Sequence, residues 1–586
     1  MPATLRQPPF AVLLLLVWLA AASGLMLENW ADTGRTLLDT DDAMRLTQMK
    51  AWLAGQGWFD LHQSRLQPPH GYDSHWSRLI DAGLAGLFFA FRIFAAPDFA
   101  ERLMRAIWPL LWLLPTMAGM AAIAWRLAGR EAALVALVLA LVGVPAYQQF
   151  TPGRIDHHNV QIALTMLTVA ATVWSDRFPL AGFAAGFSTA AALAIGYEAL
   201  PYLAACGLAF VIRFVADLKG TRALRNYALA LAAGSVAFFL VSVPPEHWTR
   251  PLCDAVAINA VAAIVAGSLV LAGAAQIVPV REQPRVGVVV FAGLVMLAVG
   301  IAFEPRCLKG PYAMVDPAVW PIWLSEVREM QPLLRVFEIN PLTATAIAAF
   351  PFAGVLASIS LWHDQRTRND YGTLVARTVF LIAVLTTLLA IRAYSYAIWL
   401  GMPIVAAAAL KLFDLLKLRT LGGRAFASLL LTPLALSSGA IGVASAAGFD
   451  DRDSFARPAS RACFETANYA ALSDIPPGLI VGDVSYGPFV LALTHHRVLA
   501  APYHRLTVGI TATHHILTSR PDIAEEMARG VGAQYILACG LRPPDGIAAQ
   551  DLASSLWGQL QAGQVPEWLE PVQLRDTVLK VYRIRG

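Results

Sequence analysis

Charged residues are scarce in this sequence: they make up 14% of its 586 residues, while 57% are hydrophobic. Since a soluble globular protein carries about a quarter charged residues, the composition excludes that class and indicates a polytopic membrane protein. The net charge of +4 is small and is spread over the loops, so nucleic-acid binding has no support. Internal repeats are missing too, which disfavours a transporter or flippase, since many transporters contain inverted repeats.

Long apolar runs are what the sequence has instead, and thirteen of them approach the length of about 20 residues that a bilayer requires. They cover residues 9–27, 105–126, 131–149, 159–175, 179–196, 198–216, 225–243, 255–278, 284–303, 341–361, 374–392, 394–411 and 424–447. The first run is either an uncleaved span, which its length favours, or a signal peptide, because AAAS resembles a small-residue cleavage site. In both cases residue 28 emerges outside the cytoplasm.

A fourteenth run, 78–97, contains Arg78, Asp81 and Arg92. If it does not span, basic loops such as WRLAGRE and RFVADLKGTRALR all fall on one side, as the positive-inside rule requires. We therefore expect 78–97 to lie in or dip into the outer interface; the alternative is a true span balanced by a missed one elsewhere. This topology leaves four segments on the outer face, namely 28–104, the TPGRIDHHN loop, 304–340 and the tail from about 449.

The tail differs in kind from the rest of the chain. Short β-rich runs such as GLIVGDVSYGPFV are punctuated by Gly and Pro, and helical TSRPDIAEEMARGVG and strand-like AQYILACG follow. The sequence thus predicts a polytopic α-helical membrane domain over 1–448 and an extracytoplasmic α/β domain over 449–586. Four outward-facing cysteines suggest the disulfides Cys253–Cys307 and Cys463–Cys539, with free buried thiols as the alternative.

Acidic residues gather in three of the outer segments. Asp39, Asp41 and Asp42 follow the first span, and helix capping explains one or two of them. Asp156 precedes two histidines in the second loop, and a pair of glutamates, Glu326 and Glu329, lies in 304–340. Carboxylates with one imidazole, drawn from separate loops on one face, are typical ligands of Mg²⁺ or Mn²⁺, whereas Zn²⁺ prefers three or four Cys or His ligands.

An arginine, Arg392, opens the stretch RAYSYAIWL at an outer membrane boundary. One interpretation is a snorkelling side chain that reaches the lipid headgroups. The other is a phosphate ligand near the cation, because guanidinium matches phosphate geometry.

In this order, the motifs resemble the catalytic subunit of oligosaccharyltransferase and its single-chain bacterial and archaeal relatives, within the GT-C glycosyltransferases. The matching stretches are DDAMR with Asp42, GRIDHHN with Asp156 and His158, REMQP with Glu329, and RAYSY with Arg392. Thirteen spans followed by an extracytoplasmic domain is also the architecture of that family. The resemblance covers essentially the whole membrane region.

The resemblance implies transfer of a glycan from a polyprenyl-pyrophosphate donor to a protein or glycolipid acceptor on the periplasmic face of a bacterial inner membrane. It assigns Asp42, Asp156, His158 and Glu329 to Mn²⁺ or Mg²⁺, with Glu326 as the alternative to Glu329. Arg392, with the neighbouring Tyr394, is assigned to the donor phosphate. Further candidates for substrate contacts, each with interfacial anchoring as the alternative, are Tyr197, Glu198, His75 and Arg78.

The tail departs from the family pattern. Oligosaccharyltransferases carry WWDYG there, whereas this chain has GDVSYG, which keeps Tyr486 and Gly487 and lacks both tryptophans. We therefore expect a different acceptor from the Asn-x-Ser/Thr sequon. A GT-C enzyme that takes a single sugar from a polyprenyl monophosphate is the alternative reading of the same motifs.

Overall fold

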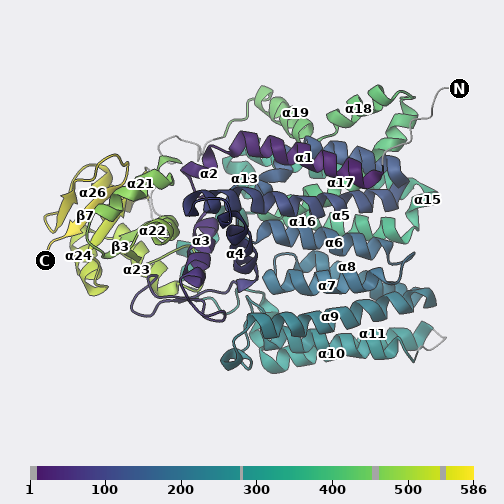
Figure 1. Cartoon of the computed structure of the whole chain (residues 1–586), viewed down its shortest axis with the longest axis horizontal. Helices are drawn as coiled ribbons and strands as arrows, with labels where there is room; N and C mark the ends of the chain where they lie inside the picture. The colour runs from purple at the N-terminus through teal and green to yellow at the C-terminus, as the bar shows by residue number, and fades with distance from the viewer. Residues whose placement is uncertain (1–8, 278–281, 452–460, 541–548) are drawn as a thin grey trace.

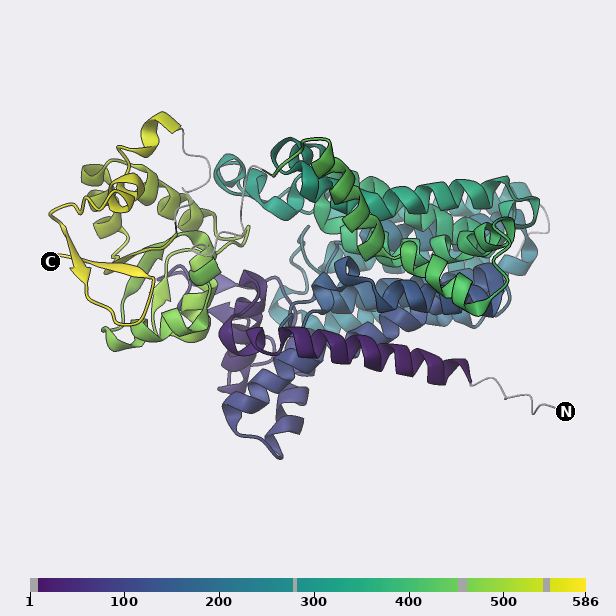
Figure 2. The same ribbon diagram turned by 90° about the horizontal axis from the view of Figure 1, so that it is seen from above.

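The computed structural model describes residues 9–277, 282–451, 461–540 and 549–586. It has two parts: a bundle of apolar helices and a C-terminal domain built on a small sheet (Figure 1). The chain enters at one end of the bundle, and its C-terminus lies in the domain beyond the opposite end. The same separation is visible in the view from above (Figure 2).

The bundle helices carry apolar side chains on the faces that point away from the protein, where lipid replaces water. Leu16 and Leu294, for example, are 57% and 58% exposed. The bundle consists of α1 (Phe10–Asn29), α5 (Pro97–Leu141), α6 (His158–Trp174), α7 (Ala181–Ile195), α8 (Leu200–Ala216), α9 (Thr221–Ser242), α10 (Ile258–Ala274), α11 (Glu282–Phe303), α14 (Pro341–His363), α16 (Tyr371–Leu389), α17 (Tyr394–Leu415), α18 (Leu421–Leu430) and α19 (Pro433–Ala446).

These helices match the predicted apolar runs, and the chain is a multi-pass membrane protein. Helix α5 covers two of the runs and breaks between them at Gly129, whose φ of 78° suits glycine alone. Within the described residues, seven helices are long and apolar enough to cross a bilayer, or eight with the bent pair α18–α19. Helices such as α7 and α8 are shorter, so the count of thirteen spans stays a prediction.

The run 78–97 forms the 15-residue helix α4 (Arg78–Arg92). With α3 (Thr40–Leu53) it runs crosswise to the bundle helices, between the bundle and the C-terminal domain (Figure 1). Two of its charged residues are buried and paired, because Asp81 lies 3.1 Å from both Arg78 and the buried Arg45 of α3. The crosswise direction agrees with the expectation that this segment is not one of the spans.

The C-terminal domain contains a five-stranded mixed sheet in the order β4-β3-β5-β7-β6. Its central strands are buried because they are continuous apolar runs, LIVG in β3 and YILA in β5. The strands are β3 (Leu479–Gly482), β4 (Arg497–Val498), β5 (Tyr535–Ala538), β6 (Leu569–Val572) and β7 (Lys580–Ile584). The helices beside them include α21 (Thr466–Ala470), α22 (Gly487–Leu493), α23 (Thr507–Thr518), α24 (Pro521–Gly530) and α26 (Leu556–Gln561).

The first outer loop and the C-terminal domain share one hydrophobic core, to which Leu46 and Trp76 contribute from the loop and Phe489 from the domain. Backbone hydrogen bonds join Val498 to Arg65 at 2.9 Å and to Gln67 at 2.8 Å. The Arg65 guanidinium also donates to three carbonyl oxygens at and beyond the end of α22. The tail and the 28–104 loop therefore pack as one body.

Both suggested disulfides are formed. Cys253–Cys307 joins the segment before α10 to the start of the 304–340 loop, and Cys463–Cys539 lies inside the C-terminal domain. The remaining cysteine, Cys206, is buried and free in the bundle.

Candidate active site

The centre of the site is the cluster of Asp156, His157 and His158, at the end of the loop that leads into α6. The loop reverses direction at Gly153, whose φ of 109° is readily adopted only by glycine. The Asp156 Oδ1 atom lies 2.5 Å from His157 Nδ1, and its Oδ2 atom lies 3.2 Å from His158 Nε2. One ligand atom from each of the three side chains lies within 4.8 Å of the others, so they can share one metal ion.

The environment of Asp156 favours a bound cation. Its side chain is buried, and its Oδ2 atom accepts no hydrogen bond from the described residues. Burial raises the pKa of this carboxyl, but the facing histidines and Arg154 outweigh burial and hold its pKa well below the usual range. A buried, ionised carboxylate with an unused oxygen fits a divalent ion.

Glu198 joins this cluster to Arg392. It lies in the turn between α7 and α8, with Oε2 2.8 Å from His158 Nδ1 and Oε1 3.5 Å from His157 Nε2. The same carboxylate pairs with the Arg392 guanidinium, which enters from the short helix η7 (Ile391–Ala393) before α17. The Arg392 guanidinium therefore shares a carboxylate partner with the two histidines.

Glu329 approaches from the 304–340 loop, in the short helix η6 (Arg328–Met330). Its Oε1 atom lies 3.6 Å from Arg392 Nη1, and the backbone N–H of Ile391 donates to Gln331 O at 3.1 Å, which ties this loop to η7. Partial burial and the nearby carboxylates of Asp39 and Asp156 raise the pKa of Glu329. The alternative acid, Glu326, pairs with Arg335 at 3.3 Å instead.

Asp42 and Asp41 have different surroundings, although both lie in the first turn of α3. The buried Asp42 carboxylate accepts hydrogen bonds from the N–H groups of Ile155 (2.7 Å) and Asp156 (3.0 Å) and from Arg154 Nη1 (2.9 Å). These contacts fasten α3 to the Asp156 loop. Burial raises the pKa of Asp42 to about 7, against the opposing effect of Arg154.

The Asp41 carboxylate is partly exposed, and no described residue forms a hydrogen bond or an ion pair with it. Burial of the group and the negative charges of Asp156, Asp39 and Glu329 raise its pKa well above the usual value. Asp41 is thus near enough to the other acids for their charges to act on it, whereas Asp42 fastens the Asp156 loop. Helix capping, the other reading of this acidic run, belongs to Asp39, which accepts from the Thr40 N–H.

The other candidate residues in the membrane domain lie elsewhere. Tyr394 is 9% exposed and contacts Ser437 of α19. Two residues further along α17, the Tyr396 hydroxyl donates to Gln161 Oε1 in α6. Arg78 is 2% exposed and donates to Gln48, Asp60 and other acceptors within the first outer loop, so it stabilises that loop rather than lining an open groove.

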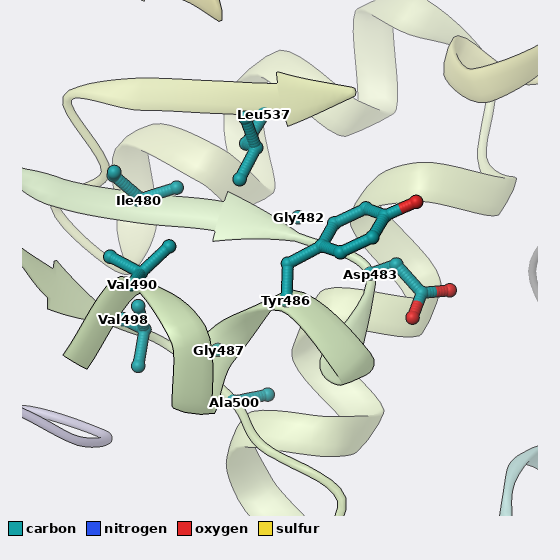
Figure 3. Close-up of a pocket in the computed structure, with 9 residues that line it drawn as sticks. All are labelled: Ile480, Gly482, Asp483, Tyr486, Gly487, Val490, Val498, Ala500 and Leu537. Atoms are coloured by element: carbon teal, nitrogen blue, oxygen red, sulfur yellow. The ribbon is translucent and has the colours of Figure 1, made fainter. Parts of the chain in front are cut away.

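His75 borders the C-terminal domain, and Tyr486 lies within it. The His75 ring is 4.8 Å from that of His504, and burial together with His504 and Arg505 lowers its pKa well below the usual value. The Tyr486 hydroxyl donates to Cys539 O at 2.8 Å. Figure 3 draws Tyr486 beside the end of β3, with the Asp483 side chain pointing to the same side.

Two residues of the site, Asp41 and His157, were missing from the cation ligands that the motifs suggested. A signal for each is present in the sequence, since each is the immediate neighbour of an assigned ligand. Which neighbour faces the cluster depends on tertiary contacts, above all on Arg154.

No family model matches the chain, and no curated protein matches it in sequence. Solved structures of the oligosaccharyltransferase from Archaeoglobus fulgidus, an archaeal protein called AglB, resemble it closely in fold. The apo form is 15% identical and has a TM-score of 0.67, and the alignment covers 92% of this chain and 70% of that one. The complex with an inhibitory peptide and a dolichol-phosphate is 15% identical, with a TM-score of 0.64 and coverage of 89% and 69%.

A third structure of the same archaeal protein, a complex with Zn and sulfate, is 14% identical and has a TM-score of 0.58, with coverage of 89% and 67%. At this identity the likeness establishes the fold. The predicted fold is therefore confirmed: this chain has the fold of the archaeal oligosaccharyltransferase.

Proposed function

We propose that this protein is a membrane glycosyltransferase that transfers a glycan from a polyprenyl-pyrophosphate donor to an acceptor outside the cytoplasm. The observation that carries the proposal is the contact of two complementary sites. A cluster able to bind a cation, Asp156 with His157 and His158, lies against an anion-binding arginine, Arg392, through the shared partner Glu198. Both kinds of group stabilise the negative charge that develops on a departing pyrophosphate.

The residues of the cluster fit Mn²⁺ or Mg²⁺, since carboxylate oxygens suit both and imidazole favours Mn²⁺. Asp156, His157 and His158 would hold the ion, with Asp41 and Glu329 completing the site from two other segments. When bound, the ion supplies electrostatic stabilisation for negative charge on the leaving phosphate. A solved structure of the archaeal protein is a complex with Zn and sulfate, so that protein binds a divalent cation and an anion.

The protein's own groups have three roles in this proposal. Arg392 binds a phosphate oxygen of the donor, because a planar guanidinium can donate two parallel hydrogen bonds to it. Glu198 keeps that guanidinium oriented before the donor arrives. Asp42 positions the Asp156 loop through its hydrogen bonds to two backbone N–H groups.

Binding of dolichol-phosphate and a peptide by the archaeal protein supports a lipid-linked donor for this chain. The acceptor is proposed to differ from a sequon peptide. The Tyr486 hydroxyl is already used by Cys539 O, and the positions before it carry Asp483 and Val484 where the oligosaccharyltransferases have tryptophans. Asp483 and Val484 make a smaller and more polar surface than two tryptophans would, and we propose a non-sequon protein or a glycolipid as the acceptor.

We propose the bacterial inner membrane as the location, with the site facing the periplasm. Both disulfides, Cys253–Cys307 and Cys463–Cys539, belong to the segments that surround the acids or to the domain next to them. Disulfides persist in oxidising compartments, which supports this orientation.

The test is a deletion strain whose lipid-linked glycans and glycoconjugates are profiled by mass spectrometry. A lipid-linked glycan should accumulate, one class of glycoconjugate should vanish, and wild-type protein should restore both. Restoration by an Asp156→Ala variant would contradict the assigned site. Analysis of the released carrier separates a pyrophosphate product from the monophosphate that the alternative GT-C chemistry would leave.

A further inference from the structure

A short segment of the C-terminal domain, Tyr503–Arg505, contacts the membrane domain at two points. The Arg505 guanidinium forms a two-pronged ion pair with Asp254, from Nε to Oδ2 at 2.7 Å and from Nη2 to Oδ1 at 2.8 Å. His504 Nε2 lies 2.6 Å from the same Oδ2 atom. At the other end, the Tyr503 hydroxyl donates to Thr40 O at 3.1 Å.

The Asp254 contact reaches the loop that carries Glu329. Asp254 follows Cys253, and the disulfide from Cys253 to Cys307 connects it to the start of the 304–340 segment. Burial raises the pKa of Asp254, but His504 and Arg505 outweigh burial and hold that pKa far below its usual range. The carboxylate is therefore charged at neutral pH, where it pairs with Arg505.

The Thr40 contact reaches Asp41. Thr40 is the first residue of α3, so a hydrogen bond to its carbonyl oxygen fixes the turn in which Asp41 lies. The Tyr503 ring also packs against Tyr72 and Trp76, with ring centroids 5.5 Å apart in both cases. Trp76 in turn lies 5.9 Å from the His157 ring. Tyr503 is thus in contact with the wall that backs the histidines.

We propose that Tyr503, Arg505 and Asp254 are positioning residues of the active site. The Tyr503–Arg505 segment holds the Asp41 turn and the Glu329 loop at the distances that the Asp156–His158 cluster requires. The C-terminal domain then serves the catalytic step itself, in addition to any contact with the acceptor. The expected effect on kcat rests on the proposed glycosyl transfer. The expected effect on the Asp41 turn and the Glu329 loop does not depend on that function.

The experiment uses the full-length purified protein in lipid nanodiscs and the variants Asp254→Asn, Arg505→Gln, Arg505→Lys and Tyr503→Phe. The matched control is Arg520→Gln, which removes an exposed ion pair with Asp522 in the same domain. Two measurements are made on each variant. One is hydrogen exchange of residues 38–44 and 320–332, and the other is kcat and donor KM with a polyprenyl-pyrophosphate-linked oligosaccharide.

We expect faster exchange in both peptides for Asp254→Asn and Arg505→Gln, and in residues 38–44 alone for Tyr503→Phe. A misplacement of about 1 Å can cost about 100-fold in rate, so kcat should fall by about 10- to 100-fold with donor KM within about twofold. Arg505→Lys should recover part of kcat, because it keeps the charge and loses the paired geometry. The control should match the wild type in both measurements.

Unchanged exchange in both peptides, or an unchanged kcat in folded Asp254→Asn and Arg505→Gln, would overturn the proposal. A raised donor KM at constant kcat would also overturn it, since that result assigns these residues to donor binding. If Asp254→Asn does not fold, Tyr503→Phe and Arg505→Lys decide, because Tyr503→Phe removes one hydrogen bond and Arg505→Lys keeps the positive charge opposite Asp254. A wild type without turnover would contradict the proposed function, while the exchange data would still decide the structural part.

Discussion

Asp41 and Asp42 are adjacent, but the structure predicts opposite effects for their replacement by asparagine. Asp42 is fully buried and accepts three hydrogen bonds, one of them from the Arg154 guanidinium. In Asp42→Asn the amide oxygen can still accept from the backbone, but its NH₂ group would face Arg154. Loss of a hydrogen bond to a charged partner costs about 1.5–3 kcal/mol, and the NH₂ group and the guanidinium would be two facing donors, so this variant should be less stable.

Asp41→Asn should leave stability unchanged or raise it. The Asp41 carboxylate is repelled by Asp39, Asp156 and Glu329, which raise its pKa, and its replacement relieves that repulsion. Activity should nevertheless fall by about 100- to 1,000-fold, the usual loss when one group that stabilises transition-state charge is removed. Thermal unfolding in detergent, followed by intrinsic fluorescence, and turnover of a lipid-linked donor measure the two properties on the same samples.

The result that would refute this reasoning is the reverse pattern. A stable, inactive Asp42→Asn together with a fully active Asp41→Asn would make Asp42 the cation ligand that the sequence motif suggested. Asp39→Asn is a matched control for charge, because Asp39 pairs with Arg154 at 2.9 Å at the edge of the same cluster.

Three further predictions follow from the same geometry. Arg392→Lys should raise the donor KM more than tenfold and leave the unfolding temperature within a few degrees, because lysine lacks the paired N–H donors. Affinity for Mn²⁺, measured by titration calorimetry, should rise with pH, since the raised pKa of Asp41 keeps a proton on the ligand at lower pH; Asp41→Asn should flatten this dependence. A peptide with an Asn-x-Thr sequon should receive no glycan; sequon-dependent glycopeptide detected by mass spectrometry would contradict this.

Much of the fold could be predicted from the sequence, because spanning helices require apolar runs whatever their partners are. The distribution of basic loops placed 78–97 outside the spans through the positive-inside rule, and its Arg78 and Asp81 are paired within the first outer loop. The common core of that loop and the tail could not be predicted. It depends on contacts such as Arg65 with the end of α22, 426 residues away in sequence.

Site residues could be predicted where a sequence motif marks them, but not where a tertiary contact determines which side chain belongs to the site. Asp156, His158, Glu329 and Arg392 come from three segments that the structure brings together. The choice between Asp41 and Asp42 depends on Arg154, because adjacent residues in a helix point in different directions. Asp254 has no local signal at all, since its partner Arg505 lies 251 residues further along the chain.

The most direct test of the account is cation-dependent cleavage of the donor by purified protein. A polyprenyl-pyrophosphate-linked oligosaccharide is incubated with the wild type in Mn²⁺, in EDTA, and in EDTA followed by excess Mn²⁺, and the remaining lipid-linked donor is quantified by mass spectrometry. We predict slow loss of donor in Mn²⁺, with water accepting the glycan and the polyprenyl pyrophosphate released, protection in EDTA, recovery on readdition, and no loss with Asp156→Ala. Donor that stays intact in every condition, or is consumed equally in EDTA and by Asp156→Ala, would contradict the account.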